Sequence, residues 1–333
     1  MTSRRIALSV SLSVVTVLLA GCAGPAHLPE EKFYLIASNI KVPYWQSALA
    51  GLNKASAQMK GIRTEMAGPD KFDPKGQHEE FQRVLGQKPA GILVSVSDPN
   101  VLQPDIDAAI SRGIPVITMD SDAEGSKRLL FIGTDNYKAG TIGGKRLVKE
   151  LNGKGNVVFY SMPEQANLAQ RMRGYSDVLA GHPGIKVVQT VDIKGDAGTA
   201  FDKTKEMVAK KEIEKIDAFV CLEAIACPEI ADVLDREKVS GKLIIAMDTD
   251  QRTLELIQKG AITATIGQKP FTMAFYGVKM LDDLYHNKQA ALDHDWSQDS
   301  FSQLPQFVDT GATLIDKTNV AAYLKERESA TSN

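Results

Sequence analysis

The sequence predicts an α/β protein made of two similar lobes, each built on a doubly wound parallel sheet. Short apolar runs rich in β-branched residues alternate with segments of helical period, and this alternation is typical of parallel sheets covered by helices on both faces. The chain carries one motif twice, because MDSD ends an apolar run at 119–122 and MDTD ends another at 247–250. The predicted strands exceed what one ordinary sheet holds, so the repeat indicates one copy in each lobe.

The first half of the chain contains the strands of the first lobe. The apolar runs are KFYLIAS (32–38), RTEMA (63–67), GILVSVS (91–97), PVITMD (115–120) and LLFIGTD (129–135). Most of them are apolar at consecutive positions, as strands buried on both faces are. Amphipathic segments predict helices at 44–59, 75–86, 101–111 and 138–151.

The second half repeats the same alternation of strands and helices. Its apolar runs are NVVFYSM (156–162), KVVQTVD (186–192), DAFVCLE (217–223), LIIAMD (243–248) and TATIGQ (263–268). Segments of helical period predict helices at 168–180, 199–210, 228–237, 253–259 and 271–286. Two α/β units of similar plan therefore follow one another along the chain.

The first 22 residues are typical of an exported bacterial lipoprotein. A short basic start precedes the apolar run 6–20, which is short for a membrane span and suits a signal peptide. The run ends in LAGC, which resembles a lipobox, so we expect a leader at 1–21 and a lipid on Cys22. The alternative is an ordinary signal peptide that leaves Cys22 free. Residues 22–31 have linker composition and are expected to tether the protein to a bacterial membrane, in the periplasm or at the cell surface.

Polar side chains follow the strands at the edge where open parallel sheets bind ligands. The first half offers Ser38, Ser95, Ser97, Asp120, Thr134 and Asp135, with Tyr44 and Trp45 at a helix start. The second half offers Met162, Glu223, Asp248 and Gln268, with Arg171 and Arg173 from a helix. A single Asp here would most simply cap a helix. The same acid in both halves, facing an Arg and a Gln, favours contact with a ligand.

These residue types suit a small polyhydroxylated ligand. Carboxylates accept hydrogen bonds from hydroxyls, Arg donates through a planar fork, and an aromatic face covers the C–H side of a sugar ring. Catalytic motifs are missing, because the sequence contains no HExxH, GxSxG or Walker motif, and no GxGxxG follows the first strand. The spaced acids of SDPNVLQPDID lack the Gly and Glu of a calcium loop. We therefore expect no catalytic residue, no metal site and no cofactor.

The charge balance argues against a nucleic-acid partner. Lys and Arg number 39 against 41 Asp and Glu, which gives a formal net charge of −2, and no basic run is present. Two cysteines of the exported part, Cys221 and Cys227, flank LEAIA. In an oxidising compartment they form either a disulfide or two buried thiols, and their spacing does not decide between the two.

From residue 32 to about 320 the chain resembles a periplasmic binding protein of the ribose-binding type, a sugar receptor of ABC importers. The stretches that carry the resemblance are VPYWQSALAGL, GILVSVSD, GIPVITMDSD, IGTDNYKAG, QRMRGY, LIIAMDTD and ATIGQKP. The family has two lobes joined by a three-segment hinge, with ligand in the cleft between them. The resemblance implies an N-terminal lobe of 32–134 plus 270–304, a C-terminal lobe of 135–269 plus 305–325, and a tail at 326–333.

The resemblance also implies which residues bind ligand. The stacking aromatics match Tyr44 and Trp45, the acids of the two lobes match Asp120 and Asp248, and the remaining positions match Ser95, Thr134, Arg173 and Gln268. Three positions depart from the ribose pattern. Ser121 replaces an Arg, Glu223 replaces an Asn, and Ala197 falls where a third aromatic stacks. These changes point away from ribose toward an amino sugar, a polyol or a larger monosaccharide, unless Glu223 serves only as a helix cap.

The resemblance implies a monomeric receptor that closes its hinge on a sugar or polyol and is then recognised by ABC permease and ATPase subunits. No catalysis is expected. An alternative is a periplasmic sensor that presents its ligand to a chemoreceptor or a histidine kinase. A sugar-sensing repressor would need a helix-turn-helix where this chain has its leader. An enzyme would need an acid–base pair in the cleft, for which Asp120 with Glu223 is the one candidate.

Overall fold

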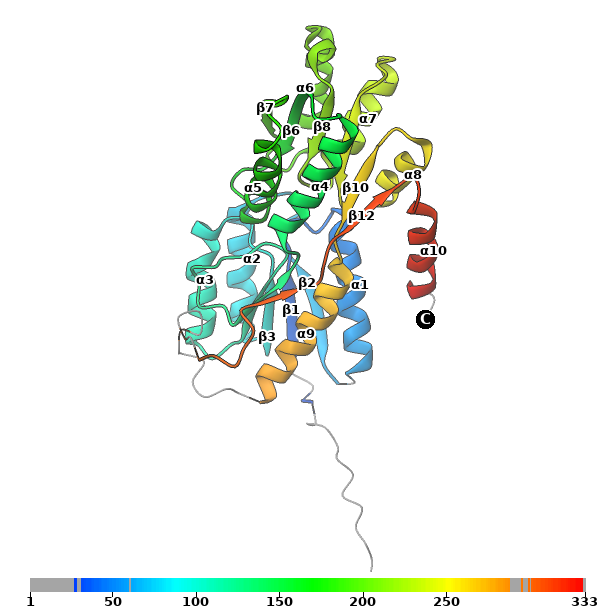
Figure 1. Ribbon diagram of the computed structural model, residues 1–333. Helices are drawn as coiled ribbons and strands as arrows, with labels where there is room; N and C mark the ends of the chain where they lie inside the picture. Colours follow the sequence, from blue (N-terminus) through cyan, green and yellow to red (C-terminus); the bar gives the residue numbers. More distant parts are fainter. Residues whose placement is uncertain are drawn as a thin grey trace, which may run out of the picture.

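Two six-stranded sheets organise the described part of the chain into two lobes, drawn one above the other in Figure 1. The computed structural model describes residues 27–28, 31–59, 61–287, 295, 299 and 301–331. The predicted leader 1–21 and Cys22 lie outside the described residues. None of the helices within the described ranges combines the length and the apolar character needed to cross a bilayer.

The first sheet lies in the lower lobe of Figure 1 and is parallel throughout, in the order β11-β5-β4-β3-β1-β2. Its strands are β1 (Lys32–Ile36), β2 (Arg63–Ala67), β3 (Gly91–Val94), β4 (Val116–Met119), β5 (Leu130–Gly133) and β11 (Phe307–Asp309). Two pairs of helices cover it: α1 (Pro43–Gln58) with α9 (Pro270–His286), and α2 (Pro74–Gly86) with α3 (Pro99–Ser111). The middle strands β3, β4 and β5 are buried along their whole length, as helices on both faces require.

The second sheet has the order β12-β10-β9-β8-β6-β7. Its strands are β6 (Gly155–Ser161), β7 (Ile185–Asp192), β8 (Ala218–Cys221), β9 (Leu243–Met247), β10 (Ala264–Gly267) and β12 (Thr313–Asp316). The helices are α4 (Asn136–Glu150), α5 (Ala166–Ala180), α6 (Ala197–Ala209), α7 (Ala226–Arg236), α8 (Gln251–Lys259) and α10 (Val320–Thr331), with a 3-10 turn η1 (Glu212–Lys215). Val157 and Phe159 join one core while Val158 and Tyr160 join another, so this sheet is also buried on both faces.

The two sheets repeat one plan, which confirms the predicted fold class. The order β2-β1-β3-β4-β5-β11 of the first corresponds, strand by strand, to β7-β6-β8-β9-β10-β12 of the second. Strand β4 ends at Met119 and its counterpart β9 ends at Met247, so the two copies of the Met-Asp motif occupy equivalent positions. The one difference in direction is that β12 runs antiparallel to β10, whereas β11 runs parallel to β5.

All ten predicted strands and all nine predicted helices are present. Several helices begin one or two residues earlier than predicted, because a preceding Asp caps the first turn. Asp135, for example, accepts a hydrogen bond from the backbone N–H of Lys138 at 2.8 Å. The elements that the sequence did not predict are η1, β11, β12 and α10. The two strands are three and four residues long and mostly not buried, so no continuous apolar run marks them in the sequence.

The chain passes between the lobes three times: between β5 and α4, between β10 and α9, and between β11 and β12. The third passage corrects the predicted boundary at 304/305. Residues Phe307–Asp309 pair with β5 of the first sheet, so they do not belong to the second lobe. Strand β11 is short and the passage to the second lobe follows it directly, so no sequence pattern separated the strand from the passage.

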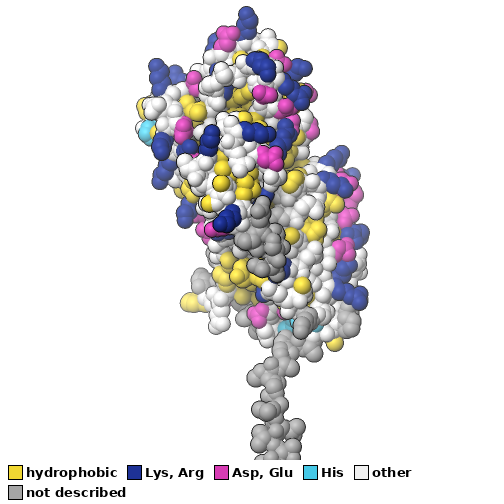
Figure 2. Space-filling view, turned by 90° about the vertical axis from the view of Figure 1, so that its right-hand side faces the viewer, with side chains coloured by type: hydrophobic (Ala, Val, Ile, Leu, Met, Phe, Trp, Pro, Cys, Tyr) yellow, Lys and Arg dark blue, Asp and Glu magenta, His cyan; other side chains and the backbone are white. Residues whose placement is uncertain are grey.

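Both ends of the described chain are more structured than predicted. Residues 326–331 continue α10 instead of forming a tail. Within the predicted tether 22–31, His27 and Glu31 contact α9. On the face that Figure 2 shows, Lys and Arg side chains are interspersed with Asp and Glu side chains over both lobes, so this face carries no large patch of one charge.

Candidate ligand-binding cavity

A cavity lies between the lobes at the carboxyl ends of the strands, and residues of both lobes line it. The first lobe contributes Ser38, Asn39, Val42, Tyr44, Trp45, Phe72 and Asp120. The second lobe and the crossing beside it contribute Met162, Gln165, Asn167, Leu168, Arg171, Gly195, Glu223, Ala224, Ile225, Asp248 and Gln268. Nine residues that the sequence singled out are among these: Ser38, Tyr44, Trp45, Asp120, Met162, Arg171, Glu223, Asp248 and Gln268.

Asp120 is held at the end of β4 by the backbone and by two hydroxyl groups. Its N–H donates to the Ile132 carbonyl at 3.1 Å, and its φ of 65° turns the chain out of the strand. Its carboxylate accepts hydrogen bonds from the Tyr44 hydroxyl at 2.7 Å and from the Ser95 hydroxyl at 3.1 Å. The Asn167 amide of the other lobe lies 3.5 Å away. Ser95 itself does not line the cavity, but its hydroxyl helps to position the Asp120 carboxylate, which does.

Asp248 has the same relation to β9. Its N–H donates to the Ile266 carbonyl at 2.9 Å, and its φ is 69°. The carboxylate accepts from the Gln268 amide at 2.9 Å. Neither this Asp nor Asp120 caps a helix, because Asp250 caps α8 and Asp135 caps α4, the first helix after Asp120. The simplest alternative for the repeated acid is therefore wrong.

Arg171, not Arg173, reaches the cavity, which corrects the residue carried over from the RMRG segment. Arg171 is only 2% exposed, and it donates to the Asn136 side chain and to the Leu222 carbonyl at 2.8 and 2.7 Å. Its Nη2 is buried without a hydrogen-bond partner among the described residues. Arg173 is exposed and lies over the ring of Tyr137 at 5.0 Å. Residues two apart point to different sides of a helix, so one of the two had to face solvent.

Two glycines set the rotation of α5 that turns Arg171 inward. A Cβ at Gly140 would lie 2.1 Å from the Arg171 carbonyl oxygen, and a Cβ at Gly174 would lie 2.2 Å from the Tyr137 carbonyl oxygen. Helices α4 and α5 therefore approach one another through backbone at both points. This close packing is a property of the helix pair, and the sequence of α5 alone did not reveal which Arg it buries.

Glu223 lines the cavity, and its carboxylate also binds backbone N–H groups at the start of α7. Its carboxylate accepts hydrogen bonds from the N–H groups of Ile225 and Ala226 at 2.6 and 3.2 Å. A disulfide joins Cys221 to Cys227 across this turn, which answers the question that the spacing left open. The bridge closes the short loop that carries Glu223.

Burial dominates the electrostatics of the cavity. It raises the pKa of Glu223 to about 7 and that of Asp248 to about 7, against the opposing charge of Arg171. Burial also raises the pKa of Asp120, again partly offset by Arg171 and by hydrogen bonds from Tyr44 and Ser95. Three buried acids thus share one guanidinium. Donors that pair with these carboxylates would relieve the cost of burying them.

Aromatic rings form the apolar part of the lining. Tyr44 and Trp45 pack edge to face with centroids 5.0 Å apart. Phe72, which the sequence did not single out, enters from the loop between β2 and α2. A Cβ added to Gly195, in the other lobe, would lie 2.3 Å from the Cβ of Phe72. Phe72 and the Gly195 backbone therefore meet where the lobes face each other. Ala197, the position of the missing third aromatic, does not line the cavity.

Thr134 is buried at the first crossing but does not line the cavity, and its hydroxyl has no hydrogen-bond partner among the described residues. Sequence reasoning missed Gln165 and Asn167, which line the cavity from the loop after β6 and the start of α5. In the sequence both fall between the predicted strand 156–162 and the predicted helix 168–180, where no pattern marks them. Only their closeness to a strand end pointed to them.

The chain is similar to known periplasmic binding proteins. A family model described as a periplasmic binding protein domain matches residues 33–289. The ribose import binding protein of Bacillus subtilis is 23% identical over 300 residues, covering 85% of this chain and 94% of that protein. A solved arabinose-binding protein from Geobacillus stearothermophilus is 30% identical, with 88% of this chain and 99% of that chain covered and a TM-score of 0.72.

A second solved structure is a carbohydrate transporter solute-binding protein from Agrobacterium radiobacter in complex with D-arabinose. It is 26% identical, covers 89% of this chain and 98% of its own, and gives a TM-score of 0.79. Together these matches confirm the resemblance that the motifs indicated.

Proposed function

Because the chain belongs to the periplasmic binding protein domain family, we propose that it is the receptor of an ABC importer for a monosaccharide or a related polyol. At the coarser level the chain is a periplasmic sugar-binding protein of the importer type, and its relatives are binding proteins, not enzymes. The observation that carries the proposal is the placement of Asp120 and Asp248, one from each lobe, in the lining of one cavity.

The ligand contacts proposed here come from both lobes and from the crossing. They are Tyr44, Trp45, Asp120, Arg171, Glu223, Asp248 and Gln268. Two buried atoms in this set lack a hydrogen-bond partner among the described residues, Nη2 of Arg171 and Oε1 of Gln268. A buried polar group without a partner is costly. One is a donor and the other an acceptor, so a ligand hydroxyl, which is both, would satisfy each of them.

The balance of charge favours a ligand rich in hydrogen-bond donors. Asp120, Glu223 and Asp248 can only accept when ionised, and Arg171 is the one cation that lines the cavity among the described residues. Neighbouring hydroxyls of a sugar or polyol donate to carboxylates through charge-assisted bonds, each worth about 1.5–3 kcal/mol. An amino sugar would add a positive charge against the surplus acid. Anionic sugars are disfavoured by the same surplus.

Hinge closure is the proposed mechanism of capture. The three passages between the lobes are short, and the Phe72 side chain touches the second lobe beside Gly195. A ligand bound first to one lobe would complete its contacts when the other lobe rotates onto it, which shifts the population toward the closed form. Permease and ATPase subunits would then recognise the closed monomer. A sensor partner in place of the importer would use the same closed form.

A lipid anchor is proposed from the leader sequence and fits the disulfide. The bond between Cys221 and Cys227 belongs to an oxidising compartment, as expected for a chain exported before its Cys22 is lipidated. Mass spectrometry of the membrane fraction tests this directly. A diacylglyceryl group on an N-terminal Cys22 is the expected result, and an unmodified soluble chain would contradict it.

A thermal-shift screen tests the function. The chain from Ala23, which contains every described residue, is screened against pentoses, hexoses, amino sugars, polyols and inositols. A ligand that binds only the folded state raises the melting temperature with concentration. At least one sugar or polyol is expected to do so. If none shifts a folded sample freed of bound ligand by unfolding and refolding, the carbohydrate proposal fails.

A further inference from the structure

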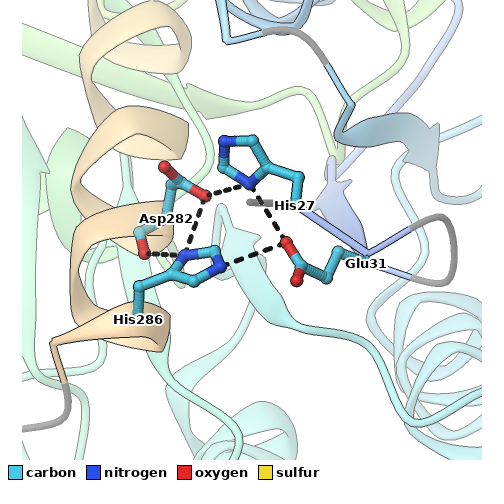
Figure 3. Close-up of side chains that lie close together, drawn as sticks. All are labelled: His27, Glu31, Asp282 and His286. Carbon is cyan, nitrogen blue, oxygen red and sulfur yellow. Dashed lines mark hydrogen bonds and ion pairs between the residues drawn. The ribbon is translucent and has the colours of Figure 1, made fainter. Parts of the chain in front are cut away.

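Four side chains gather at the end of the first lobe opposite the cavity. Glu31 directly precedes β1, at the amino edge of the sheet, and His27 lies four residues before it. Asp282 and His286 come from the last turns of α9. Figure 3 shows the imidazoles and carboxylates pointing toward one another around a common centre. This group, His27, Glu31, Asp282 and His286, is called the basal cluster below.

The spacing of the basal cluster suits a small coordinated ion. His27 Nδ1 lies 3.1 Å from Glu31 Oε2 and 3.5 Å from Asp282 Oδ1, and His286 Nε2 lies 3.3 Å from the same Glu31 oxygen. One ligand atom from each residue can be chosen so that all four lie within 4.8 Å of one another. Zinc bonds to nitrogen and oxygen of about 2.0–2.1 Å place tetrahedral ligand atoms about 3.3–3.4 Å apart.

The hydrogen bonds around the basal cluster orient its members. Nδ1 of His286 lies 3.0 Å from the Asp282 carbonyl oxygen, so it donates its proton there and leaves a lone pair on Nε2. That lone pair faces Glu31 Oε2, which carries lone pairs as well. The other Glu31 oxygen accepts from the Leu28 N–H at 2.9 Å. A histidine that donates one ring N–H to a carbonyl and offers the other nitrogen is the usual arrangement at metal sites.

Two atoms of the basal cluster are buried without a hydrogen bond among the described residues, Nε2 of His286 and Oδ1 of Asp282. Glu31 is only 3% exposed. A buried carboxylate beside buried lone pairs is unfavourable unless a cation or a proton lies between them. His27 Nδ1, 3.1 Å from Glu31 Oε2, and His286 Nδ1, 3.3 Å from Asp282 Oδ1, can each offer one N–H to these carboxylates. A metal ion between the four side chains, or an additional proton on the histidines, would supply the positive charge that balances the two acids.

We propose that the basal cluster binds one divalent transition-metal ion, with zinc the best match. Two neutral imidazoles and two carboxylates supply a −2 charge that one such ion neutralises. Imidazole ligands favour zinc and its neighbours over calcium and magnesium, which prefer oxygen. The ion would join the segment before β1 to the end of α9, and so fix the start of the folded chain against the first lobe.

The competing arrangement is an ion-pair cluster closed by protons. Burial lowers the pKa of His286, but its bond to the Asp282 carbonyl and the charges of Asp282 and Glu31 raise it overall. In that arrangement the cluster responds to pH and ignores zinc. The sequence pointed to neither arrangement, because the two pairs of residues lie at opposite ends of the first lobe's sequence and form no short motif.

Zinc titration of the chain from Ala23 tests the proposal. The protein carries no polyhistidine tag, is stripped with a chelator, and competes with a chromophoric chelator for zinc. We expect one zinc per chain and a higher melting temperature when zinc is added. His27→Gln and His286→Gln should each weaken zinc binding at least about tenfold. The control His78→Gln alters a separate pair, in which His78 Nδ1 lies 2.7 Å from Asp105, and should leave zinc binding unchanged.

Two results would overturn the metal site: less than one zinc per chain at micromolar concentration, or equal zinc binding by the double variant H27Q/H286Q and the control. Far-ultraviolet circular dichroism of each variant shows that it is folded. The inference does not rest on the proposed function, since a chain that binds no sugar would still be expected to bind zinc.

Discussion

Asp120 and Asp248 take the same left-handed backbone conformation, with φ of 65° and 69°, at equivalent points of the two sheets. Each follows the Met that ends its strand, and each donates its N–H to the carbonyl of an Ile in the next strand along the sheet. A residue with a Cβ adopts this conformation at a cost, and such strain is concentrated at functional sites. The repeated Met-Asp motif is thus a repeated geometry that turns a carboxylate out of the sheet into the shared cavity.

The strain at Asp248 predicts an unusual order of stability among its variants. The free energy of unfolding of Asp248→Gly should exceed that of Asp248→Ala by about 1–2 kcal/mol, because only Gly adopts positive φ without a Cβ clash. Urea denaturation measures both. At the control position Asp232, inside α7, the order should reverse, since Gly costs about 1 kcal/mol relative to Ala in a helix. Equal stabilities of the two Asp248 variants would contradict the strain.

The buried acids predict that the ligand-free protein loses stability as pH rises. The folded-state pKa values of Glu223 and Asp248, raised to about 7, exceed their ordinary values of 4.5 and 3.8. Between those values and about pH 7 the folded state holds protons that the unfolded state has released, so the free energy of unfolding falls through this window and levels off above it.

Unfolding in urea at several pH values checks this slope. The double variant E223Q/D248N removes both titrating groups and should flatten the slope relative to the wild type. Other groups contribute equally to both proteins, so the difference isolates the two acids. An identical slope in the double variant and the wild type would show that the two carboxylates do not titrate in this window.

The contact between Phe72 and Gly195 predicts that closure is sensitive to a single methyl group. Gly195→Ala places a Cβ against Phe72. If the clash makes the free energy of closure about 1.4 kcal/mol less favourable, ligand binding should weaken about tenfold. Gly113→Ala is the control, because its φ of 77° matches the 74° of Gly195 while nothing lies within 4 Å of its Cβ. Calorimetry should find wild-type affinity in the control, and equal losses in both variants would refute the contact's role.

The disulfide predicts a coupled loss of stability and affinity. The double variant C221A/C227A opens a loop of seven residues, with a sequence separation of 6, and should lose roughly 2 kcal/mol of stability by the chain-entropy model. Because Glu223 lies inside that loop, ligand affinity should fall as well. Reduced wild-type protein should behave like the variant. Unchanged affinity in both would mean that the hydrogen bonds of Glu223 hold the turn alone.

The two arginines of α5 predict opposite outcomes of the same substitution. Arg171→Gln removes the buried guanidinium whose Nη2 lacks a partner among the described residues and should weaken binding by a factor of about 10–100, as expected for a charge-assisted hydrogen bond. Arg173→Gln changes an exposed side chain over Tyr137 and should leave affinity within about twofold. Calorimetric titration of both variants with the same sugar measures the two affinities. A larger loss of affinity in Arg173→Gln than in Arg171→Gln would reverse the assignment.

Sequence reasoning reached the fold and half of the residues that line the cavity, because both depend on local pattern. Apolar runs and helical periods predicted β1 to β10 and α1 to α9, though not α10, and the strand ends identified Asp120 and Asp248. It missed what depends on packing between distant segments. The rotation of α5 is set by backbone contact through Gly140 and Gly174, Phe72 enters from a loop, and the basal cluster joins residues far apart in the chain.

The most direct test of the central claim is calorimetric titration of the sugar or polyol that gives the largest thermal shift. Wild type should bind one ligand per chain. Asp120→Asn and Asp248→Asn each remove one carboxylate, from different lobes, and each should weaken binding by about 10–100-fold through loss of a charge-assisted hydrogen bond. Losses in both variants would establish that one ligand is held by both lobes. Wild-type affinity in either variant would show that the acid of that lobe does not bind the ligand, and would contradict the shared cavity.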